Sequence, residues 1–239
     1  MSPSELADYR VVTVDGYAVE TWLDENLPGV EYISVPTALN ALRMVDNGTA
    51  DVYLDPLATA NYLARQNDLA ELQSAGPLGD DYALSIAYTE GDQILGSIMQ
   101  KLIDSIVDSE ARIIIDRTID PPSFTAAEQT WLDLHSTITV AYDPSWPPYE
   151  YVDGLGHLAG LSGAYASMFT AMTGSDFATA ENIRSWGDAL GHMRAGTADV
   201  MFVIEDTAER DTYMDFTDAW MHIDIEILTL ADTPAKMCR

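Results

Sequence analysis

The chain lacks most residues and motifs that would reveal its chemistry directly. Cys238 is the only cysteine among 239 residues, which excludes an intramolecular disulfide and a cluster of thiolate metal ligands. The four histidines, at positions 135, 157, 192 and 222, do not have the spacing of a zinc site. A phosphate loop, a dinucleotide fingerprint and a Gly-x-Ser-x-Gly elbow are also missing. We therefore expect no metal and no cofactor.

Basic residues are scarce. The chain has 11 Lys and Arg against 39 Asp and Glu, for a formal net charge of -28. This argues against nucleic acid or an anionic membrane as partner, because both attract positive charge. Lys101 and Lys236 are the only lysines. Such a composition favours a halophilic protein, since a Debye length of about 3 Å in molar salt suppresses self-repulsion; an ordinary acidic secreted protein is the alternative.

Long apolar runs are missing too. No stretch reaches 18 apolar residues, and residues 1–10 have neither the basic start nor the apolar core of a signal peptide. We expect a soluble chain without a targeting segment. With 47% apolar and 21% charged residues, the chain is globular and long enough for one large or two modest domains.

A short repeat organises the chain. Gly-Thr-Ala-Asp-Val occupies residues 48–52 and recurs at residues 196–200, and an Ala-Leu pair begins seven residues before each first glycine. Each copy predicts a helix, a glycine C-cap and an apolar strand. We therefore expect two related α/β units.

The hydrophobic pattern predicts alternating strands and helices, which indicates an α/β fold with parallel pairing. Thr125 and Glu128 have the spacing of a capping box. Strands are predicted at residues 11–14, 30–35, 52–54, 82–88, 138–142, 177–180, 200–204 and 223–230. Helices are predicted at residues 16–23, 37–47, 57–65, 94–116 (one or two helices), 125–134, 162–173 and 188–194, with a helix start at 207–213.

The most informative segment follows the strand predicted at residues 138–142. Two prolines at positions 147 and 148 hold Trp146 and Tyr149 on a short turn of low entropy. About sixty residues later, Arg210 lies at a predicted helix start, and its guanidinium offers a rigid fork to a carboxylate. This combination predicts a site for a small anionic molecule. The alternatives are packing of the aromatics around the prolines, and a surface ion pair of Arg210 worth about 0–1 kcal/mol.

These segments resemble type II periplasmic binding proteins, bacterial extracellular solute-binding protein family 3. The likeness is greater to the tandem Venus-flytrap sensor domains of membrane-bound histidine kinases and diguanylate cyclases. Residues 143–160 are similar to the opening strand and loop of the family, and residues 196–218 to its strand and Thr-x-x-Arg helix start. Residues 124–135 are similar to the inter-domain connector, and residues 16–20 look like the opposite lobe.

The resemblance implies an α/β fold of periplasmic-binding-protein type II (Venus flytrap) lobes, with mixed, mostly parallel sheets flanked by helices. The lobe-2-like piece comes first. We therefore expect residues 1–122 to be the lobe-2-like half of a first flytrap domain with its C-terminal helices. Residues 123–136 are then a connector helix, residues 137–231 the lobe-1-like half of a second flytrap, and residues 232–239 a tail.

An alternative organisation is a circular permutation, in which the two pieces close on each other. This alternative requires Asp55 to share a cleft with Trp146 and Arg210.

The resemblance also implies a set of ligand-binding residues, with Arg210 on the ligand carboxylate and an aromatic side chain against its body. Three of them also suit a purely structural role: Thr207 as a helix N-cap, Asp55 as a loop acid before Pro56, and Trp186 as part of the core. No residue is expected to be catalytic or to bind metal. The expected ligand-binding residues are Arg210, Trp146, Tyr149, Trp186, Thr207, Asp55 and Tyr17.

The function implied is that of an extracytoplasmic sensor module, periplasmic or extracellular, which recognises an amino acid or related small carboxylate and signals by hinge closure. Its partners would be a small anionic or zwitterionic ligand and, in the full-length protein, a membrane-attached kinase or cyclase output domain. One alternative is the solute-binding component of an ABC uptake transporter. Another is an enzyme, a dehydratase or a wall-lytic transglycosylase accessory domain, with Glu150 and Glu205 as paired carboxylates. Their spacing is not diagnostic, so we expect no enzyme.

Overall fold

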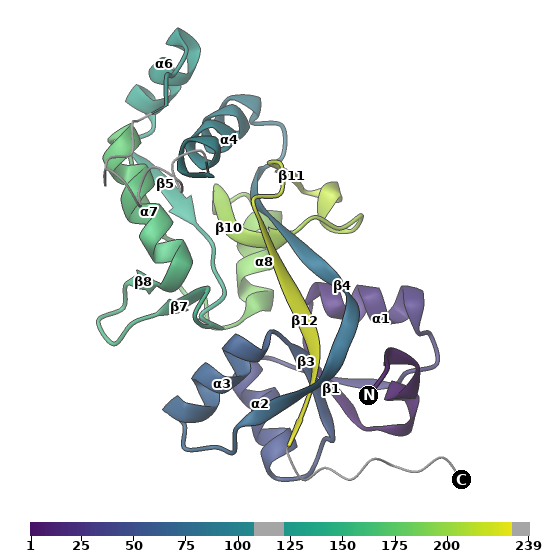
Figure 1. Ribbon diagram of the computed structural model, residues 1–239. Helices are drawn as coiled ribbons and strands as arrows, with labels where there is room; N and C mark the ends of the chain where they lie inside the picture. Colours follow the sequence, from purple (N-terminus) through teal and green to yellow (C-terminus); the bar gives the residue numbers. More distant parts are fainter. Residues whose placement is uncertain (108–121, 231–239) are drawn as a thin grey trace.

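A nine-stranded sheet runs through the whole molecule (Figure 1). The computed structural model describes residues 1–107 and 122–230. The strand order is β2-β1-β3-β12-β4-β10-β5-β9, and β11 pairs with β4. The strands are β1 (Val11–Val14), β2 (Tyr32–Val35), β3 (Val52–Asp55), β4 (Leu72–Thr89), β5 (Thr137–Val140), β9 (Asp176–Thr179), β10 (Val200–Glu205), β11 (Met214–Phe216) and β12 (Met221–Leu230).

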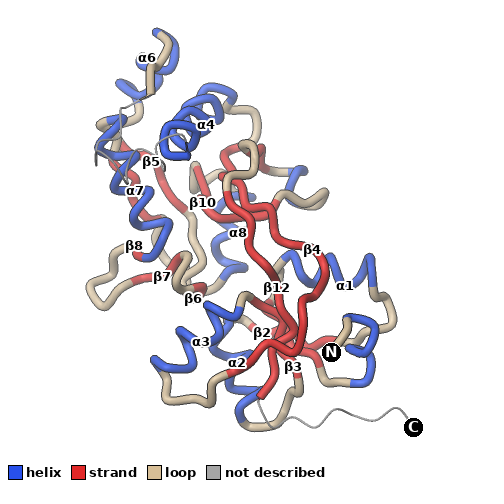
Figure 2. Tube along the Cα trace, viewed as in Figure 1, coloured by secondary structure: helices blue, strands red, loops and turns tan. Residues whose placement is uncertain are grey.

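The sheet joins two lobes. In the N-terminal lobe, β1 pairs in parallel with β2 and β3, beside α1 (Ala18–Asn26), α2 (Ala38–Asp46) and α3 (Leu57–Gln66). In the C-terminal lobe, β5 pairs in parallel with β9 and β10, and the helices are α4 (Gln93–Val107), α6 (Ala126–Leu134), α7 (Gly160–Thr173) and α8 (Trp186–Arg194). The antiparallel ribbon of β4 and β12 crosses both lobes (Figure 2). The expected α/β fold, with a mixed sheet flanked by helices, is confirmed.

The sequence repeat has the predicted structure in both lobes. Helices α2 and α8 each end just before a glycine with positive φ, 74° at Gly48 and 63° at Gly196. The backbone N–H of Gly48 donates to the carbonyl of Val45, and that of Gly196 donates to the carbonyl of Met193. Each glycine then leads into a buried strand, β3 or β10. The repeat therefore places the end of β3 in one lobe and the end of β10 in the other beside the space between the lobes.

Strand β4 differs most from the sequence prediction, because it begins at Leu72 rather than at residue 82. Gly76, Pro77 and Gly79 lie within its first half, and all are residue types that disfavour strands. The ribbon accommodates them through two shifts in register against β12. Strand β4 therefore extends from one lobe into the other.

Other differences concern short elements. The expected helix start at residues 207–213 is wrong, because only one 3-10 turn, Arg210–Thr212, forms before the chain returns as β11. Residues 143–160 form a second small sheet of β6 (Ser145–Trp146), β7 (Glu150–Val152) and β8 (Leu158–Ala159). The capping box of α6 is present as predicted. Residues 108–116 of the predicted helix lie outside the described residues.

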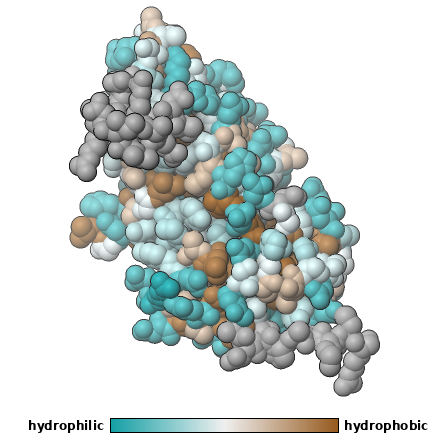
Figure 3. Space-filling view, in the orientation of Figure 1, coloured by the Kyte–Doolittle hydropathy of each residue, from teal (hydrophilic) through white to brown (hydrophobic). Residues whose placement is uncertain are grey.

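The apolar interior consists of two clusters. The larger contains residues of both lobes, including Tyr53 of β3 and Trp186 of α8. The smaller lies within the C-terminal lobe, where Phe169 and Phe202 pack beneath α4. Figure 3 shows hydrophobic residues on one face as separate small patches among hydrophilic ones. Among residues 1–107 and 122–230, no helix has the length and apolar character needed to cross a membrane.

Two helical glycines provide a matched test of the packing. A Cβ at Gly163 of α7 would lie 2.4 Å from the carbonyl oxygen of Leu158, whereas a Cβ at Gly191 of α8 would meet nothing within 4 Å. We expect Gly163→Ala to lower the free energy of unfolding by about 1–3 kcal/mol, because α7 must shift away from β8. Gly191→Ala should raise it by about 0.5–1 kcal/mol through the better helix propensity of alanine. Urea unfolding measures both values, and equal effects would contradict the described packing.

Candidate functional site

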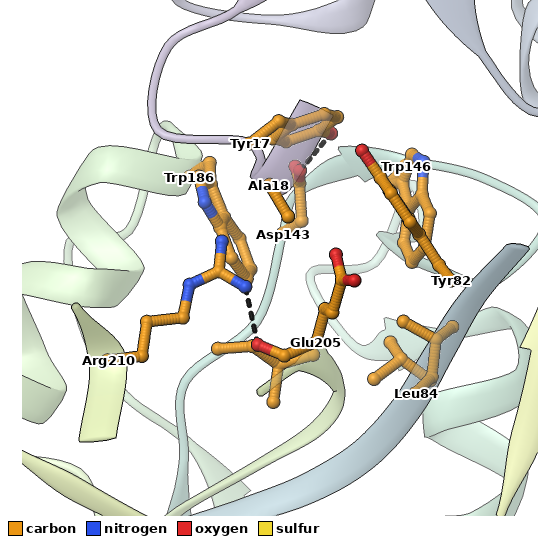
Figure 4. Close-up of a pocket in the computed structure, with 11 residues that line it drawn as sticks. Tyr17, Ala18, Tyr82, Leu84, Asp143, Trp146, Trp186, Glu205 and Arg210 are labelled. Atoms are coloured by element: carbon orange, nitrogen blue, oxygen red, sulfur yellow. Dashed lines mark hydrogen bonds between the residues drawn. The ribbon is translucent and has the colours of Figure 1, made fainter. Parts of the chain in front are cut away.

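A cavity lies between the two lobes, where the ends of β1, β5 and β10 approach strand β4 (Figure 4). Its wall contains aromatic and aliphatic side chains together with two carboxyl groups and one guanidinium. The lining residues are Tyr17, Ala18, Tyr82, Leu84, Asp143, Trp146, Trp186, Val203, Ile204, Glu205 and Arg210.

The N-terminal lobe contributes the turn between β1 and α1. Gly16 has a φ of 75°, a conformation that suits glycine, and the turn aims its carbonyl at the other lobe. This carbonyl accepts hydrogen bonds from Nε1 of Trp186 at 2.9 Å and from Nη2 of Arg210 at 3.0 Å. The next residue, Tyr17, donates its hydroxyl hydrogen to the carboxylate of Asp143. A single turn therefore makes three hydrogen bonds to the opposite lobe.

Arg210 is buried, with 3% of its surface exposed. Its Nη1 donates to the backbone carbonyl of Glu205 at 2.6 Å and its Nη2 to that of Gly16. The guanidinium carbon lies 5.4 Å from the ring centre of Trp186, a distance suited to a cation–π contact. Burial lowers the pKa of Arg210. The surface ion pair considered above does not form, because Glu209 pairs instead with Arg194.

Trp146 and Asp55 connect the lobes on the other side of the cavity. Nε1 of Trp146 donates to Oδ1 of Asp55 at 3.0 Å, and the hydroxyl of Tyr53 donates to Oδ2 of Asp55 at 2.7 Å. The ring of Tyr149 lies 4.7 Å from that of Trp146, centre to centre. Trp146 and Arg210 line the same cavity, and Asp55 reaches it only through its hydrogen bond from Trp146. Both carboxylate oxygens of Asp55 already accept hydrogen bonds from the protein itself.

Glu150 holds the aromatic loop in place. Its Oε1 accepts from the backbone N–H of Asp143 at 2.8 Å, and its Oε2 accepts from the hydroxyl of Ser162 at 2.9 Å. Both Glu150 and Asp143 are 1% exposed. Glu150 does not line the cavity, whereas Glu205 does. The geometry therefore gives Glu150 a positioning role for the loop that carries Trp146.

Burial dominates the electrostatics of the cleft. It raises the pKa of Asp55 to about 8, that of Glu150 to about 8 and that of Glu205 to about 7. The pKa of Asp143 is also raised by burial, against the opposing effect of its hydrogen bond from Tyr17. These carboxyl groups therefore hold protons much closer to neutral pH than they would in water.

The structure brings together most of the residues expected from the sequence. Tyr17, Trp146, Trp186 and Arg210 line the cavity, while Asp55 and Tyr149 contact Trp146 from behind. Thr207 is not among the lining residues. Its hydroxyl instead accepts from the backbone N–H of Arg210 at 3.4 Å.

Three polar lining residues, Asp143, Glu205 and Tyr82, were not expected at the site. Asp143 follows strand β5 closely. Its position near a strand end could have predicted from the sequence that it lies at the site. Glu205 was considered only as an enzyme candidate. Tyr82 could not be found, because its place depends on how far β4 crosses between the lobes.

The cavity is small in this arrangement. The centres of water-sized spheres occupy about 30 Å³ of it, and on this measure one water needs about 10–15 Å³. The space in this arrangement is therefore enough for about two or three water molecules. Among the described residues, no group of three or more His, Cys, Asp or Glu side chains is arranged to hold a metal ion.

A known protein family matches part of this chain. Residues 138–237 match the family model described as bacterial extracellular solute-binding proteins, family 3. The resemblance predicted from the sequence is thereby confirmed.

The chain is also similar to sensor proteins. It is 23% identical over 247 residues to the virulence sensor protein BvgS of Bordetella bronchiseptica, covering 98% of this chain and 20% of BvgS. It is 19% identical over 178 residues to the sensor protein EvgS of Escherichia coli K12, covering 70% of this chain and 15% of EvgS. The chain thus spans about a fifth or less of these relatives. The periplasmic domain of B. pertussis BvgS aligns with a TM-score of 0.38 and 21% identity, over 87% of this chain and 42% of that one.

The buried carboxyl groups predict a dependence of stability on pH. Since burial raises the pKa of Asp55 to about 8, the folded state binds more protons than the unfolded state between about pH 4 and pH 8. The free energy of unfolding should therefore be highest below the unfolded pKa and fall as the pH rises through 8, by up to about 1.4 kcal/mol per pH unit for each such group. Asp55→Asn should reduce this slope, and urea unfolding from pH 5 to 8.5 measures it. Asp8→Asn provides a control at an exposed aspartate, and an equal slope in wild type and Asp55→Asn would contradict the interpretation.

Proposed function

We propose that this chain is a non-catalytic, extracytoplasmic module that binds a small carboxylate, such as an amino acid, between its two lobes. The observation that carries the proposal is the buried Arg210, whose two bonded nitrogens reach a carbonyl from each lobe. A guanidinium is well suited to bind a carboxylate through two parallel hydrogen bonds. Trp146, Trp186 and Tyr17 give the same cavity apolar surface, as in most small-molecule sites.

The two pieces of the chain would form one working cleft, as in a circularly permuted flytrap. Three observations support this: one sheet runs through both lobes, one apolar cluster contains residues of both, and direct hydrogen bonds cross the cleft. The boundaries expected at residues 122 and 136 remain predictions. On this proposal they separate parts of one functional unit and do not separate two incomplete domains.

Ligand binding would act on the hinge formed by β4 and β12. When the lobes part, Arg210 loses the carbonyl of Gly16 and can bind the ligand. When they close, the ligand contacts both lobes, and its differential affinity for the closed form shifts the equilibrium. A shift from 1:99 to 99:1 requires about 5.5 kcal/mol of that difference.

The relatives suggest the biological setting. BvgS and EvgS are named sensor proteins and extend far beyond the length of this chain. We propose that the module lies in the periplasm or outside the cell, and that in a longer protein a membrane-attached kinase or cyclase carries the output. The family match to solute-binding proteins favours a second candidate, the binding component of an uptake transporter.

The proposal predicts that Arg210 controls carboxylate affinity. In a thermal-shift and calorimetric screen of amino acids and small carboxylates, at low and molar salt, at least one compound should raise the melting temperature. A compound present at a hundred times its Kd stabilises the fold by about 2.7 kcal/mol. Arg210→Lys keeps the charge but loses the fork, so affinity should fall about 10- to 100-fold.

Arg194→Lys is the matched control, because Arg194 lies outside the cavity in an exposed ion pair with Glu209. Its affinity should equal that of the wild type. Unchanged affinity in Arg210→Lys would refute the assigned contact.

A further inference from the structure

The loop between α2 and β3 contains an Asn-x-Thr tripeptide. It consists of Asn47, Gly48 and Thr49, and none of the other five asparagines of the chain is followed two residues later by serine or threonine. In secreted proteins, the side-chain amide of asparagine in this tripeptide is the acceptor for an N-linked glycan. Such a short pattern also arises by chance, so the geometry of the loop decides whether the amide nitrogen is available.

The side chain of Asn47 is held with this nitrogen outward. Its Oδ1 accepts from the backbone N–H of Thr49 at 2.9 Å and also from the hydroxyl of Thr49. Because a backbone N–H can only donate, the atom that it reaches is the oxygen of the amide, and Nδ2 lies on the other side. Asn47, Gly48 and Thr49 are all exposed, and a Cβ added at Gly48 would meet nothing within 4 Å. The loop therefore has room for a bulky group.

Two other helix ends show the opposite arrangement. Nδ2 of Asn26, the last residue of α1, donates to the carbonyl of Trp22 at 3.0 Å. Nδ2 of Asn67, just after α3, donates to the carbonyl of Leu63 at 2.9 Å. In both cases a helix carbonyl occupies the nitrogen, whereas at Asn47 the side chain turns toward the following residues and bonds through its oxygen. This turn is a common local conformation of asparagine, and here it leaves the nucleophilic atom free.

The loop lies at the end of β3 that is remote from the cleft. Asp55, the last residue of β3, contacts Trp146, whereas Asn47 precedes the first residue, Val52. The N–H of Val52 donates to the carbonyl of Arg10, just before β1 begins. At about 3.3 Å per residue, the start of β3 is about 10 Å from Asp55. A glycan on Asn47 would therefore leave the cavity between the lobes uncovered.

We propose that Asn47 is the acceptor of an N-linked glycan, which an oligosaccharyltransferase attaches from a lipid-phosphate-linked oligosaccharide. This inference rests on the extracytoplasmic placement in the proposed function. In the transfer, Nδ2 forms a bond to the first carbon of the sugar, while the bond from that carbon to the phosphate oxygen breaks and its electron pair leaves with the lipid phosphate. Nδ2 gives up one proton to a base of the transferase, so the linked amide is neutral and nothing is oxidised or reduced.

Mass spectrometry of the protein from the cells that produce it is the direct test. Trypsin cleaves after Arg43 and Arg65, so a single peptide contains Asn47 together with Asn61, which has leucine two residues later. Fragment spectra should place sugar on Asn47 and none on Asn61. Peptide-N-glycosidase should remove the sugar and convert Asn47 to aspartate. An unmodified Asn47 in this protein would overturn the proposal.

Translation behind a cleavable signal sequence, in the presence of microsomes, measures the acceptor capacity of the loop. The wild type should show a gel shift that an endoglycosidase reverses. Asn47→Asp should lose the shift, although it keeps an oxygen to accept both hydrogen bonds from Thr49 and so preserves the loop. Thr49→Ala should also lose it, whereas Thr49→Ser keeps a hydroxyl and should retain part of it. A shift that persists in Asn47→Asp would refute the site.

The hairpin between β7 and β8 provides a matched positive control. Oδ1 of Asp153 accepts from the backbone N–H of Leu155 at 2.8 Å, an arrangement like that of Asn47 and Thr49, and Leu155 is 81% exposed. In the Asn47→Asp background, Asp153→Asn combined with Leu155→Thr transfers the same tripeptide to this hairpin and should restore the shift. A shift from the hairpin variant but not from the wild type would show that the loop at Asn47 is no acceptor.

Ligand binding separates this inference from the proposed function. Asn47→Asp should leave the affinity for any carboxylate ligand unchanged, because the loop is remote from the cavity. If Asn47 carries sugar but no carboxylate binds, the glycan site stands and the proposed ligand class fails. If a carboxylate binds but Asn47 is unmodified, the glycan site fails and the proposed function stands.

Discussion

Removal of charged groups from water is the constraint on which the closed arrangement of this molecule depends. Asp55, Asp143, Glu150 and Arg210 are each no more than 3% exposed, and a buried charged or polar group is costly unless it has partners. Every one of the four has them. Several partners lie in the opposite lobe. The same hydrogen bonds that make burial tolerable therefore hold the two lobes together.

The proposed function requires the cleft to open, and the ribbon of β4 and β12 is suited to act as the hinge. Hydrogen bonds and aromatic contacts at strand ends and turns cross the cleft, whereas β4 and β12 are paired through both lobes. The ribbon contains register shifts, and its first part carries Gly76 and Gly79. Irregular pairing and glycine provide the local freedom that a hinge needs. On the proposed function, opening would break these hydrogen bonds and aromatic contacts and leave the backbone connection between the lobes intact.

The sequence predicted the local elements better than their assembly. The repeat with Gly48 and Gly196 was sufficient for two helix–strand units, because a glycine C-cap is a local signal. Hydrophobic alternation could not reveal the first half of β4, where glycine and proline interrupt it. Nor could it show which strand ends would meet, because this depends on contacts distant in sequence. Arg210 and Trp146 were recognised from their residue types, but Tyr82 entered the site only through tertiary structure.

On the proposed function, the hydrogen bonds of Arg210 set what a ligand would have to provide. In the closed arrangement its donors are satisfied by the neutral carbonyls of Gly16 and Glu205, so the protein itself competes with the ligand for the guanidinium. A carboxylate forms hydrogen bonds roughly twice as strong as neutral ones and can therefore displace a carbonyl. Once it does, the lobe carrying Gly16 loses its contact with Arg210. On this proposal, the lobes would close fully again only around a ligand that replaces the lost contact of Gly16, which would require recognition at more than one point of the cleft.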